Sequence, residues 1–487
     1  MKNTVSKGLF FYILTFLGVI VGVACLFMAI LVLSPGTEIF GISYYYEDTF
    51  NYVDTYTDNN GENITKKINI VNYARDNENK LIYFQDLVNG KKVEINITTG
   101  YSNVYVMQNS NTTHFGLEIK GRVTGISKSD NKKDYLVTSN YDFDNNVYNF
   151  KIEEPEILLP FSKTITINVL LPDGINLSNV DLKINTKKGN VRLAHETTNE
   201  YNLNSLEINA EESSNISIKN NIIINNGTQI VCPKGTITLK TERDSMTSAI
   251  AGGKLFIKTE SAKISIDTVC PTEFKLQSTS SSVKIENVLS DMIYDAHKGI
   301  LIITGEVKGS LTCSEDVVIS NIQIEKVTKN VLLPNANSSN ITVGYIGGDS
   351  RIVTTSGKVK IGDMRGTANI ETEKGNVEIN FNQPDDIASQ VTSRIVTKSG
   401  KIKVNYAKIQ NQNIIKTTSG EITIGFAANN DFTLIYNCKT NAPTTTRGFS
   451  LSGKSGTKDI GEGSPTKIME VENEKGKTSF SDQYIVA

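Results

Sequence analysis

The sequence predicts an all-β protein in which one N-terminal transmembrane helix precedes a β-solenoid, a chain wound into a stack of similar coils. Three observations lead to this prediction. A phrase of alternating apolar and polar residues around a glycine recurs along the chain, its copies follow at a nearly constant spacing, and one uncharged apolar run stands near the N-terminus. An antiparallel β-sandwich also alternates and also uses glycine corners, but it does not require one phrase at one spacing.

The apolar run covers residues 9–33, and we expect it to cross a membrane as an uncleaved signal anchor. It contains no charged residue, and about 25 residues at 1.5 Å each reach roughly 37 Å, enough for the hydrocarbon core of a bilayer. Lys2 and Lys7 precede the run. The positive-inside rule therefore predicts a cytoplasmic segment at residues 1–8 and an extracytoplasmic remainder.

Two other fates of this run stay open. A cleaved signal peptide usually has a shorter apolar region, of about 7–15 residues. A lipoprotein cleaved before Cys25 needs a large aliphatic residue three positions earlier, where this chain has Gly22. Gly18 and Gly22 also form a G-x-x-x-G pair, a pattern that can seat a helix dimer but is common in membrane helices.

The recurring phrase reads apolar–x–apolar–x–Thr–x–Ser/Lys–Gly–x–apolar–x–apolar. Its clearest copies are IVTTSGKVKI, RIVTKSGKIKV and NIIKTTSGEITI, which surround Gly357, Gly400 and Gly420. Ala262 and Ser281 take the place of the glycine in two copies. The corners at 262, 281 and 299 lie 19 and 18 residues apart, and a period of about 18–20 residues is typical of one coil of a β-solenoid.

The phrase also explains why the coils would stack. Two segments of period two flank each corner, so one set of side chains points inward and the other outward. The inward positions are Ile, Val and Leu, whereas Lys, Glu, Thr, Arg and Asn face outward. We expect the corner glycine to adopt a backbone angle that is costly for other residues, and the preceding hydroxyls to bond to nearby backbone. One coil cannot bury its apolar face alone, so stability comes from neighbours about 4.8 Å away.

These patterns predict the divisions of the chain. Residues 37–173 are rich in Tyr and Asn and are expected to form an irregular β-rich membrane-proximal region and the start of the solenoid. Residues 174–330 and 340–440 are expected to form two solenoid blocks, separated near Pro334. Residues 441–487 are expected to supply a Gly/Ser-rich loop and capping strands, because an open solenoid end exposes unpaired strand edges.

The stretch TITINVLLPDGINLSNVDLKINTKKGNVRL (Thr164–Leu193) and the T-x-S-G-x-I-x-I coils through Ile424 resemble the DUF4097 family of bacterial envelope repeat proteins, which carries an adhesin label. The resemblance covers roughly Val93 to Ile424. It implies a right-handed parallel β-solenoid and an envelope location, and it implies no catalytic residue. The chain departs from the family at Ala262 and Ser281 and in its long N-terminal part.

Few side chains indicate chemistry, and we predict no catalytic, cofactor-binding or metal-binding residue and no cofactor. The formal net charge of −2 over 487 residues leaves no broad positive surface for nucleic acid. His114, His195 and His297 are isolated in the sequence, and the last two stand at different offsets from their corners, so a shared metal or acid–base site is not expected.

Carboxylates are the main candidates for an enzyme, because polysaccharide lyases and hydrolases on similar coils cluster them on one face. The candidates are Asp267, Asp291, Asp295, Asp363, Asp385 and Asp386. Acidic residues at corners are, however, ordinary turn formers. The segment YDFDNN at residues 141–146 approaches a Ca²⁺ loop but lacks the downstream Glu that such a loop requires.

Two further residue sets leave alternatives open. Four cysteines have no metal-site spacing and can pair in an oxidising compartment or remain small buried thiols: Cys232, Cys270, Cys313 and Cys438. N-x-S/T sequons are glycan sites in a eukaryotic secretory pathway, but they also arise by chance in an Asn- and Thr-rich chain: Asn63, Asn96, Asn111, Asn176, Asn215, Asn226, Asn337 and Asn340.

The sequence therefore predicts a non-enzymatic, membrane-anchored, extracytoplasmic protein with adhesin-like, repeated polar ladders. Outward residues such as Lys358, Lys360, Lys401 and Lys403 would contact cell-wall polymer, a host surface or another envelope protein through many weak contacts. An envelope-stress accessory or sensor protein that acts through a membrane partner is the alternative. A polysaccharide-active enzyme is the third possibility.

Overall fold

The structure is a computed structural model that describes residues 2–33, 38–39, 42–47, 52–57, 63–68, 70–71, 91–109, 116–128, 136–142, 144–153, 157–172, 176–193, 201–219, 222–241, 248–313, 321–446 and 449–482. It divides into two compact units. Unit 1 comprises Met1–Ile175 with Asn185–Asn190, and unit 2 comprises Asn176–Ile184 with Val191–Ala487. Strand β12 (Val180–Thr186) contributes to both.

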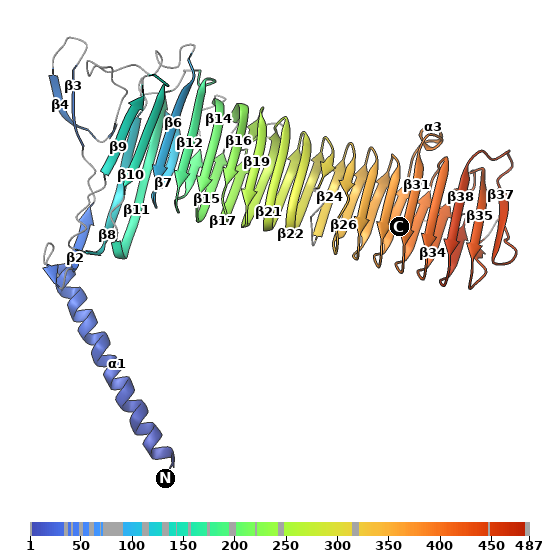
Figure 1. The fold of residues 1–487 in the computed structure, drawn as a ribbon, viewed down its shortest axis with the longest axis horizontal. Helices are drawn as coiled ribbons and strands as arrows, with labels where there is room; N and C mark the ends of the chain where they lie inside the picture. The colour runs from blue at the N-terminus through green and yellow to red at the C-terminus, as the bar shows by residue number, and fades with distance from the viewer. Residues whose placement is uncertain are drawn as a thin grey trace. The chain divides into compact units, whose positions relative to one another are not determined.

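Unit 1 begins with the helix α1, Lys2–Leu33. Its stretch Phe10–Ile30 is long and apolar enough to cross a membrane, and none of it is buried. The helix has no polar face, and exposing its apolar side chains to water is unfavourable, whereas a bilayer would bury them. The helix therefore agrees with the predicted apolar run. Figure 1 shows α1 as a single continuous helix.

The strands of unit 1 pair in both directions. β10 pairs with β6 in parallel and with β9 antiparallel, and β11 pairs with β7 in parallel and with β8 antiparallel. Val93, Ile95, Val104, Phe150 and Ile167 form part of its buried core. The strands are β1 (Glu38–Ile39), β2 (Ile42–Glu47), β3 (Tyr52–Thr57), β4 (Asn63–Ile68), β5 (Ile70–Val71), β6 (Val93–Thr99), β7 (Asn103–Asn109), β8 (Gly116–Lys128), β9 (Leu136–Asp142), β10 (Val147–Glu153) and β11 (Ile157–Pro172).

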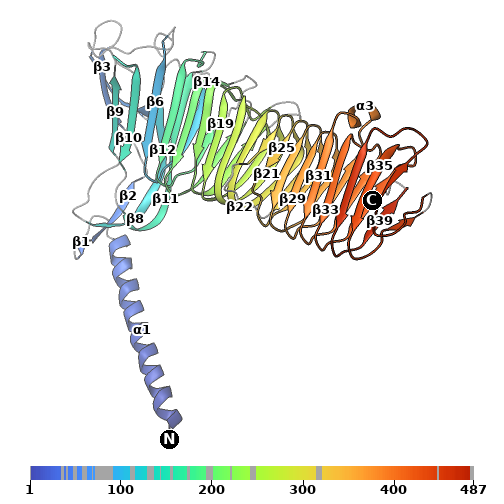
Figure 2. The same ribbon diagram turned by 45° about the vertical axis from the view of Figure 1, so that its right-hand side comes forward.

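Unit 2 consists mainly of two long ladders in which successive strands pair in parallel, as Figures 1 and 2 show. The first ladder runs through β14 (Tyr201–Ala210), β16 (Ile222–Val231), β19 (Lys254–Thr259), β21 (Glu273–Val288), β22 (Asp291–Val307), β23 (Leu311–Thr312), β25 (Val331–Leu333), β27 (Ser350–Thr354), β29 (Ala368–Thr372), β31 (Thr392–Thr397), β33 (Gln412–Thr417), β38 (Ile468–Asn473) and β35 (Phe432–Cys438).

The second ladder runs through β13 (Val191–Leu193), β15 (Ser213–Lys219), β17 (Lys234–Lys240), β20 (Ser261–Cys270), β21, β22, β24 (Asn321–Val327), β26 (Asn340–Ile346), β28 (Val359–Met364), β30 (Val377–Phe381), β32 (Ile402–Tyr406), β34 (Ile422–Phe426), β39 (Thr478–Ser481) and β36 (Thr444–Thr446). Unit 2 also contains β18 (Ile250–Ala251), β37 (Ser455–Ile460) and the one-turn helix α3 (Asp385–Ala388). These repeated parallel coils confirm the predicted all-β, solenoid-like architecture.

The ladders continue through the segment at which the sequence predicts a boundary between two blocks. β24 pairs with β26 and β25 pairs with β27, on either side of Pro334. A proline donates no backbone hydrogen bond, but Pro334 lies just after β25, outside the ladder. The coil is therefore closed by a turn that does not interrupt the stack.

The core follows from the period-two pattern. Val359, Val377 and Ile402 lie in register in consecutive coils, and all three are buried. Phe381 and Tyr406 are in register as well, with stacked rings whose centroids are 4.9 Å apart. Burial of each large apolar side chain contributes roughly 1.5–3 kcal/mol, and each needs the coil above and the coil below to exclude water.

The corners have a different physical basis from the one predicted. The Gly357 backbone has a φ of +113°, as expected, but Gly400 and Gly420 are not among the residues with positive φ. Glycine is needed there because a β-carbon at Gly400 would lie 1.7 Å from the carbonyl oxygen of Gly375 in the preceding coil. The expectation of a special backbone angle was therefore wrong for these two coils, where close approach between coils decides the residue.

The hydroxyls before the corners behave as predicted. The Thr397 Oγ1 accepts a hydrogen bond from the Gly400 N–H at 2.9 Å, and Thr417 does the same for Gly420 at 3.0 Å. Both threonines are buried, so the hydroxyl satisfies a backbone donor that water cannot reach. The residue pattern Thr-x-x-Gly thus specifies one complete corner.

Candidate functional site

Three of the outward lysines named from the sequence make ion pairs within the protein. Lys358 and Lys360 both contact Glu378 in the next coil, at 2.9 and 3.7 Å, and Lys401 contacts Glu421 at 2.8 Å. The hydrogen bond from Lys358 holds the pKa of Glu378 below its usual value, and Lys403 adds a smaller effect in the same direction. Lys358, Lys360 and Lys403 thus share the single carboxylate of Glu378, and contact of these lysines with an external polymer stays a prediction.

The candidate carboxylates do not form a cluster. Asp363 makes an ion pair with Arg365 at 2.9 Å, Asp291 accepts a hydrogen bond from the Ser310 N–H, and Asp267 accepts one from the Thr241 N–H. Asp386 is exposed in α3, and the Asp385 side chain lies outside the described residues. Among the described residues, no three His, Cys, Asp or Glu side chains are placed to hold a metal ion.

Within the segment YDFDNN, residues Asp144, Asn145 and Asn146 form a turn between the antiparallel strands β9 and β10. The Asp142 carboxylate accepts hydrogen bonds from the backbone N–H groups of Asp144 and Asn145 and from the Asn145 side chain, and these bonds lower its pKa. Asn146 has a φ of +54°, which Asn tolerates better than most residues. The carboxylate that would bind Ca²⁺ is thus used to stabilise the β9–β10 turn.

The five cysteines are all free thiols. Cys232 and Cys438 are buried, and burial raises the pKa of both thiols. These two cysteines agree with the interpretation of small buried thiols, because a buried thiol is a poor source of the reactive thiolate, whereas Cys270 and Cys313 are partly exposed.

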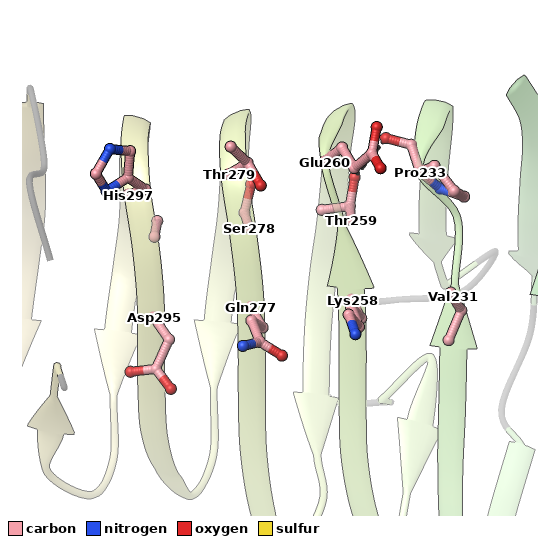
Figure 3. A pocket seen from close by; sticks show the side chains of 11 residues that line it. Val231, Pro233, Lys258, Thr259, Glu260, Gln277, Ser278, Thr279, Asp295 and His297 are labelled. Carbon is pink, nitrogen blue, oxygen red and sulfur yellow. Dashed lines mark hydrogen bonds between the residues drawn. The ribbon is translucent and has the colours of Figure 1, made fainter. Parts of the chain in front are cut away.

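Two of the residues singled out from the sequence, Asp295 and His297, line a groove on the surface of unit 2. The groove has a volume of about 410 Å³, and we call it the four-coil groove because four consecutive coils line it: Val231 and Pro233, Lys258 to Glu260, Gln277 to Thr279, and Asp295 to His297. Figure 3 shows two rows of side chains: Val231, Lys258, Gln277 and Asp295 in one, and Pro233, Glu260, Thr279 and His297 in the other. His114 and His195 lie outside the described residues.

Strand register builds these rows. Val231 is paired with Lys258, Lys258 with Gln277, and Gln277 with Asp295. Neighbouring strands in a sheet are about 4.8 Å apart, so each row presents one side chain at every such step. Between the rows, Thr259 and Ser278 are buried and hydrogen-bonded within the protein, to the Pro233 carbonyl and to Ser281, which fixes the floor of the groove.

The polar rim of the groove is largely unused within the protein. In the described part of the chain, the side chains of Lys258, Glu260, Gln277, Thr279 and His297 make no hydrogen bond or ion pair, and all five are exposed. Asp295 differs, since Lys275 contacts its carboxylate at 3.2 Å. The groove thus combines a hydrogen-bonded floor with a rim of free polar side chains, among them one lysine and one glutamate.

The signal for this groove was present in the repeat itself. Lys258, Gln277 and Asp295 each stand four residues before their corner, at 262, 281 and 299. Glu260, Thr279 and His297 each stand two residues before it. Aligning the copies on their corners places these six side chains in two rows, although the six residues form no contiguous sequence motif.

The family match concerns mainly the coils that follow the groove in the sequence. The family model of Toastrack DUF4097 matches residues 292–442. This match confirms the DUF4097 resemblance over about a third of the chain, a narrower range than the sequence reading gave. Only the last coil of the four-coil groove, at Asp295–His297, lies inside the Toastrack match.

Two further comparisons add little. A crystal structure described as a "putative adhesin" from Bacteroides fragilis aligns with 80% of this chain and 92% of its own at 10% identity, with a TM-score of 0.16. A TM-score this low supports no conclusion about fold or function. No curated protein matches the chain.

Proposed function

We propose that the chain is a non-enzymatic, adhesin-like protein, anchored by α1 with residues 1–8 in the cytoplasm, whose extracytoplasmic solenoid binds an extended polysaccharide in the four-coil groove. The Toastrack match and the apolar helix support this class of protein. Right-handed winding of the coils is part of the proposal. The observation that carries the proposal is the groove itself, with its two rows of free polar side chains.

A polysaccharide suits the geometry of these rows. The coil spacing of about 4.8 Å is close to the length of one sugar residue in an extended glycan, so a chain lying across the strands would place about one sugar beside each coil. Gln277 and Thr279 offer neutral hydrogen-bonding groups, and Lys258 can donate to a carboxylate or phosphate substituent. Binding would then accumulate from several modest contacts.

The same arrangement argues for binding without cleavage. A glycoside hydrolase needs two carboxyl groups about 5–9.5 Å apart. Glu260 and Asp295 are separated by two coil spacings and two strand positions, which places their backbones roughly 12 Å apart. The Asp295 carboxylate is also engaged in an ion pair with Lys275.

Retention on insoluble polymers tests the proposal. The full chain in detergent is incubated with peptidoglycan, wall teichoic acid on cell-wall fragments, or immobilised mucin. We expect retention on at least one polymer and roughly tenfold weaker retention for Lys258→Ala, because a hydrogen bond from a charged group contributes about 1.5–3 kcal/mol.

The matched control is Lys358→Ala, which removes a lysine that is already paired with Glu378 and is expected to leave retention unchanged. Loss of retention in both variants would indicate nonspecific charge attraction and would contradict the groove assignment. If no polymer retains the chain, the binding function is overturned. If soluble sugar fragments are released during incubation, the non-enzymatic assignment is overturned.

A further inference from the structure

The coils at the C-terminal end of unit 2 do not follow sequence order. The coil made by β38 and β39 pairs on one side with β33 and β34, and on the other side with β35 and β36. All four pairings are parallel. The last coil in the sequence is therefore inserted between two coils that precede it, and β35–β36, not β38–β39, lies outermost, with β37 antiparallel at its edge.

The inserted coil is fully integrated in the stack. Its side chains Met469, Val471 and Phe480 are buried. Asn473 donates to the Gly420 carbonyl of the inner coil and accepts from the Gly476 N–H of its own corner. Ion pairs reach both neighbours, from Glu472 to Lys416 at 3.3 Å and from Glu474 to Lys439 at 2.8 Å.

The segment that leads into this coil has the features of a hinge. Residues 461–467 have the sequence GEGSPTK and contain no strand or helix. They are held near both ends: the Glu462 N–H donates to the Asp431 carboxylate at 3.0 Å, and the Lys467 carbonyl accepts from the Thr433 N–H at 2.9 Å. Gly461 has a φ of +100°, so a glycine is needed where the loop turns.

This order has a consequence for assembly. Removing β38–β39 from the stack would leave a gap of one coil, bounded by β33–β34 and by β35–β36. That position selects its occupant by register and by apolar pattern, and neither depends on which chain supplies the coil. The hinge alone gives the chain's own coil an advantage, by raising its effective concentration.

We propose that this position is an interface for a second copy of the chain, which donates its own β38–β39 coil in exchange. The exchanged coil makes the same backbone pairs, buried contacts and ion pairs as the intramolecular one, so only the path of residues 461–467 differs between monomer and dimer. Crowding of anchored chains on one surface raises the concentration of the donor coil and favours the exchange.

Cysteines on separate chains test the proposal. Ile435 and Glu470 are Cα partners in the β35–β38 pair, and neighbouring strands at about 4.8 Å are within disulfide range. Full-length Ile435→Cys and Glu470→Cys chains are unfolded together, refolded in detergent at increasing concentration, and oxidised. We expect mass spectrometry to find the disulfide-linked peptides that contain positions 435 and 470, which can come only from two chains.

The matched control is the pair Arg351→Cys and Asn369→Cys, which are partners in β27 and β29, two consecutive coils in sequence order. Mixed chains of this pair are expected to give no such linked peptides. Deleting residues 462–464 shortens the hinge and is expected to raise the yield of the 435–470 link several-fold.

Folding is verified with one chain that carries both Ile435→Cys and Glu470→Cys, which is expected to form the link within a monomer. If that chain forms the link and the mixed chains do not at any concentration, the exchange does not occur. Equal yields for the 435–470 and 351–369 mixtures would also overturn the proposal, because they would reflect nonspecific contact.

Discussion

Replacing one corner glycine tests how the coils are held together. In Gly400→Ala, the new β-carbon would lie 1.7 Å from the Gly375 carbonyl oxygen and 2.6 Å from its carbon. Carbon–carbon contact distances are about 3.5–4.0 Å, so the two coils must separate at this corner. Overpacking of this kind costs about 1–3 kcal/mol, which corresponds to roughly a 5- to 150-fold change in an opening equilibrium.

Hydrogen exchange read by mass spectrometry localises this effect, which a global unfolding curve of a repeat protein would average. We expect amides of β31 and β32 to exchange roughly 5- to 150-fold faster in the variant. The control is Ala262→Gly, at the corner of a coil where a β-carbon is already accommodated and buried, with an expected loss of about 0.5–1 kcal/mol. If Gly400→Ala changes local exchange no more than Ala262→Gly does, close approach between coils is not the reason for glycine.

Three further outcomes are expected. Thr417→Val leaves the Gly420 N–H without its acceptor and should cost about 1–3 kcal/mol, seen as faster exchange at that corner; unchanged exchange would contradict it. Glu378→Gln removes a partly exposed pair with Lys358 and should lower stability by at most about 1 kcal/mol, an effect that should vanish near 1 M salt; a salt-independent loss would contradict it. Hydrogen bonds from lysines lower the pKa of Glu373 and Glu378 from 4.5. The stabilisation of the fold by these two ionised carboxylates is therefore complete above that value and is lost as the pH falls through the folded-state pKa. A thermal midpoint that stays constant from about pH 6 to about pH 3 would contradict this expectation.

The period-two phrase and its spacing were sufficient to predict the stacked coils, since each inward Ile, Val or Leu needs a partner one period away. The reason for the corner glycines could not be predicted. Whether Gly400 has a special backbone angle or a close neighbour depends on the separation of two coils, and sequence alone does not give that distance. The inserted coil was likewise hidden, because the phrase around Gly476 looks like a final coil and does not encode its position between β33 and β35.

The candidate site was only partly visible from the sequence. His297 and Asp295 were named as isolated candidates, but Lys258, Gln277 and Thr279 join them only when coils are placed in register. Ion pairs of the outward lysines were hidden for a related reason: Lys401, for example, pairs with Glu421 in the next coil. The two-residue period was sufficient to predict whether a side chain points inward or outward. Predicting which side chains meet across coils also requires the register of the paired strands.

In the proposed complex, a polysaccharide lies across consecutive coils in the four-coil groove. Hydrogen exchange of the full chain, with and without the polymer that retains it, tests this claim most directly. We expect slower exchange in the peptides that contain residues 231–233, 258–260, 277–279 and 295–297, with little change in the Toastrack coils beyond residue 320. Protection that is spread evenly along the ladders of unit 2 would contradict binding in the groove. Protection confined to peptides that contain the lysines paired with glutamates would contradict it as well.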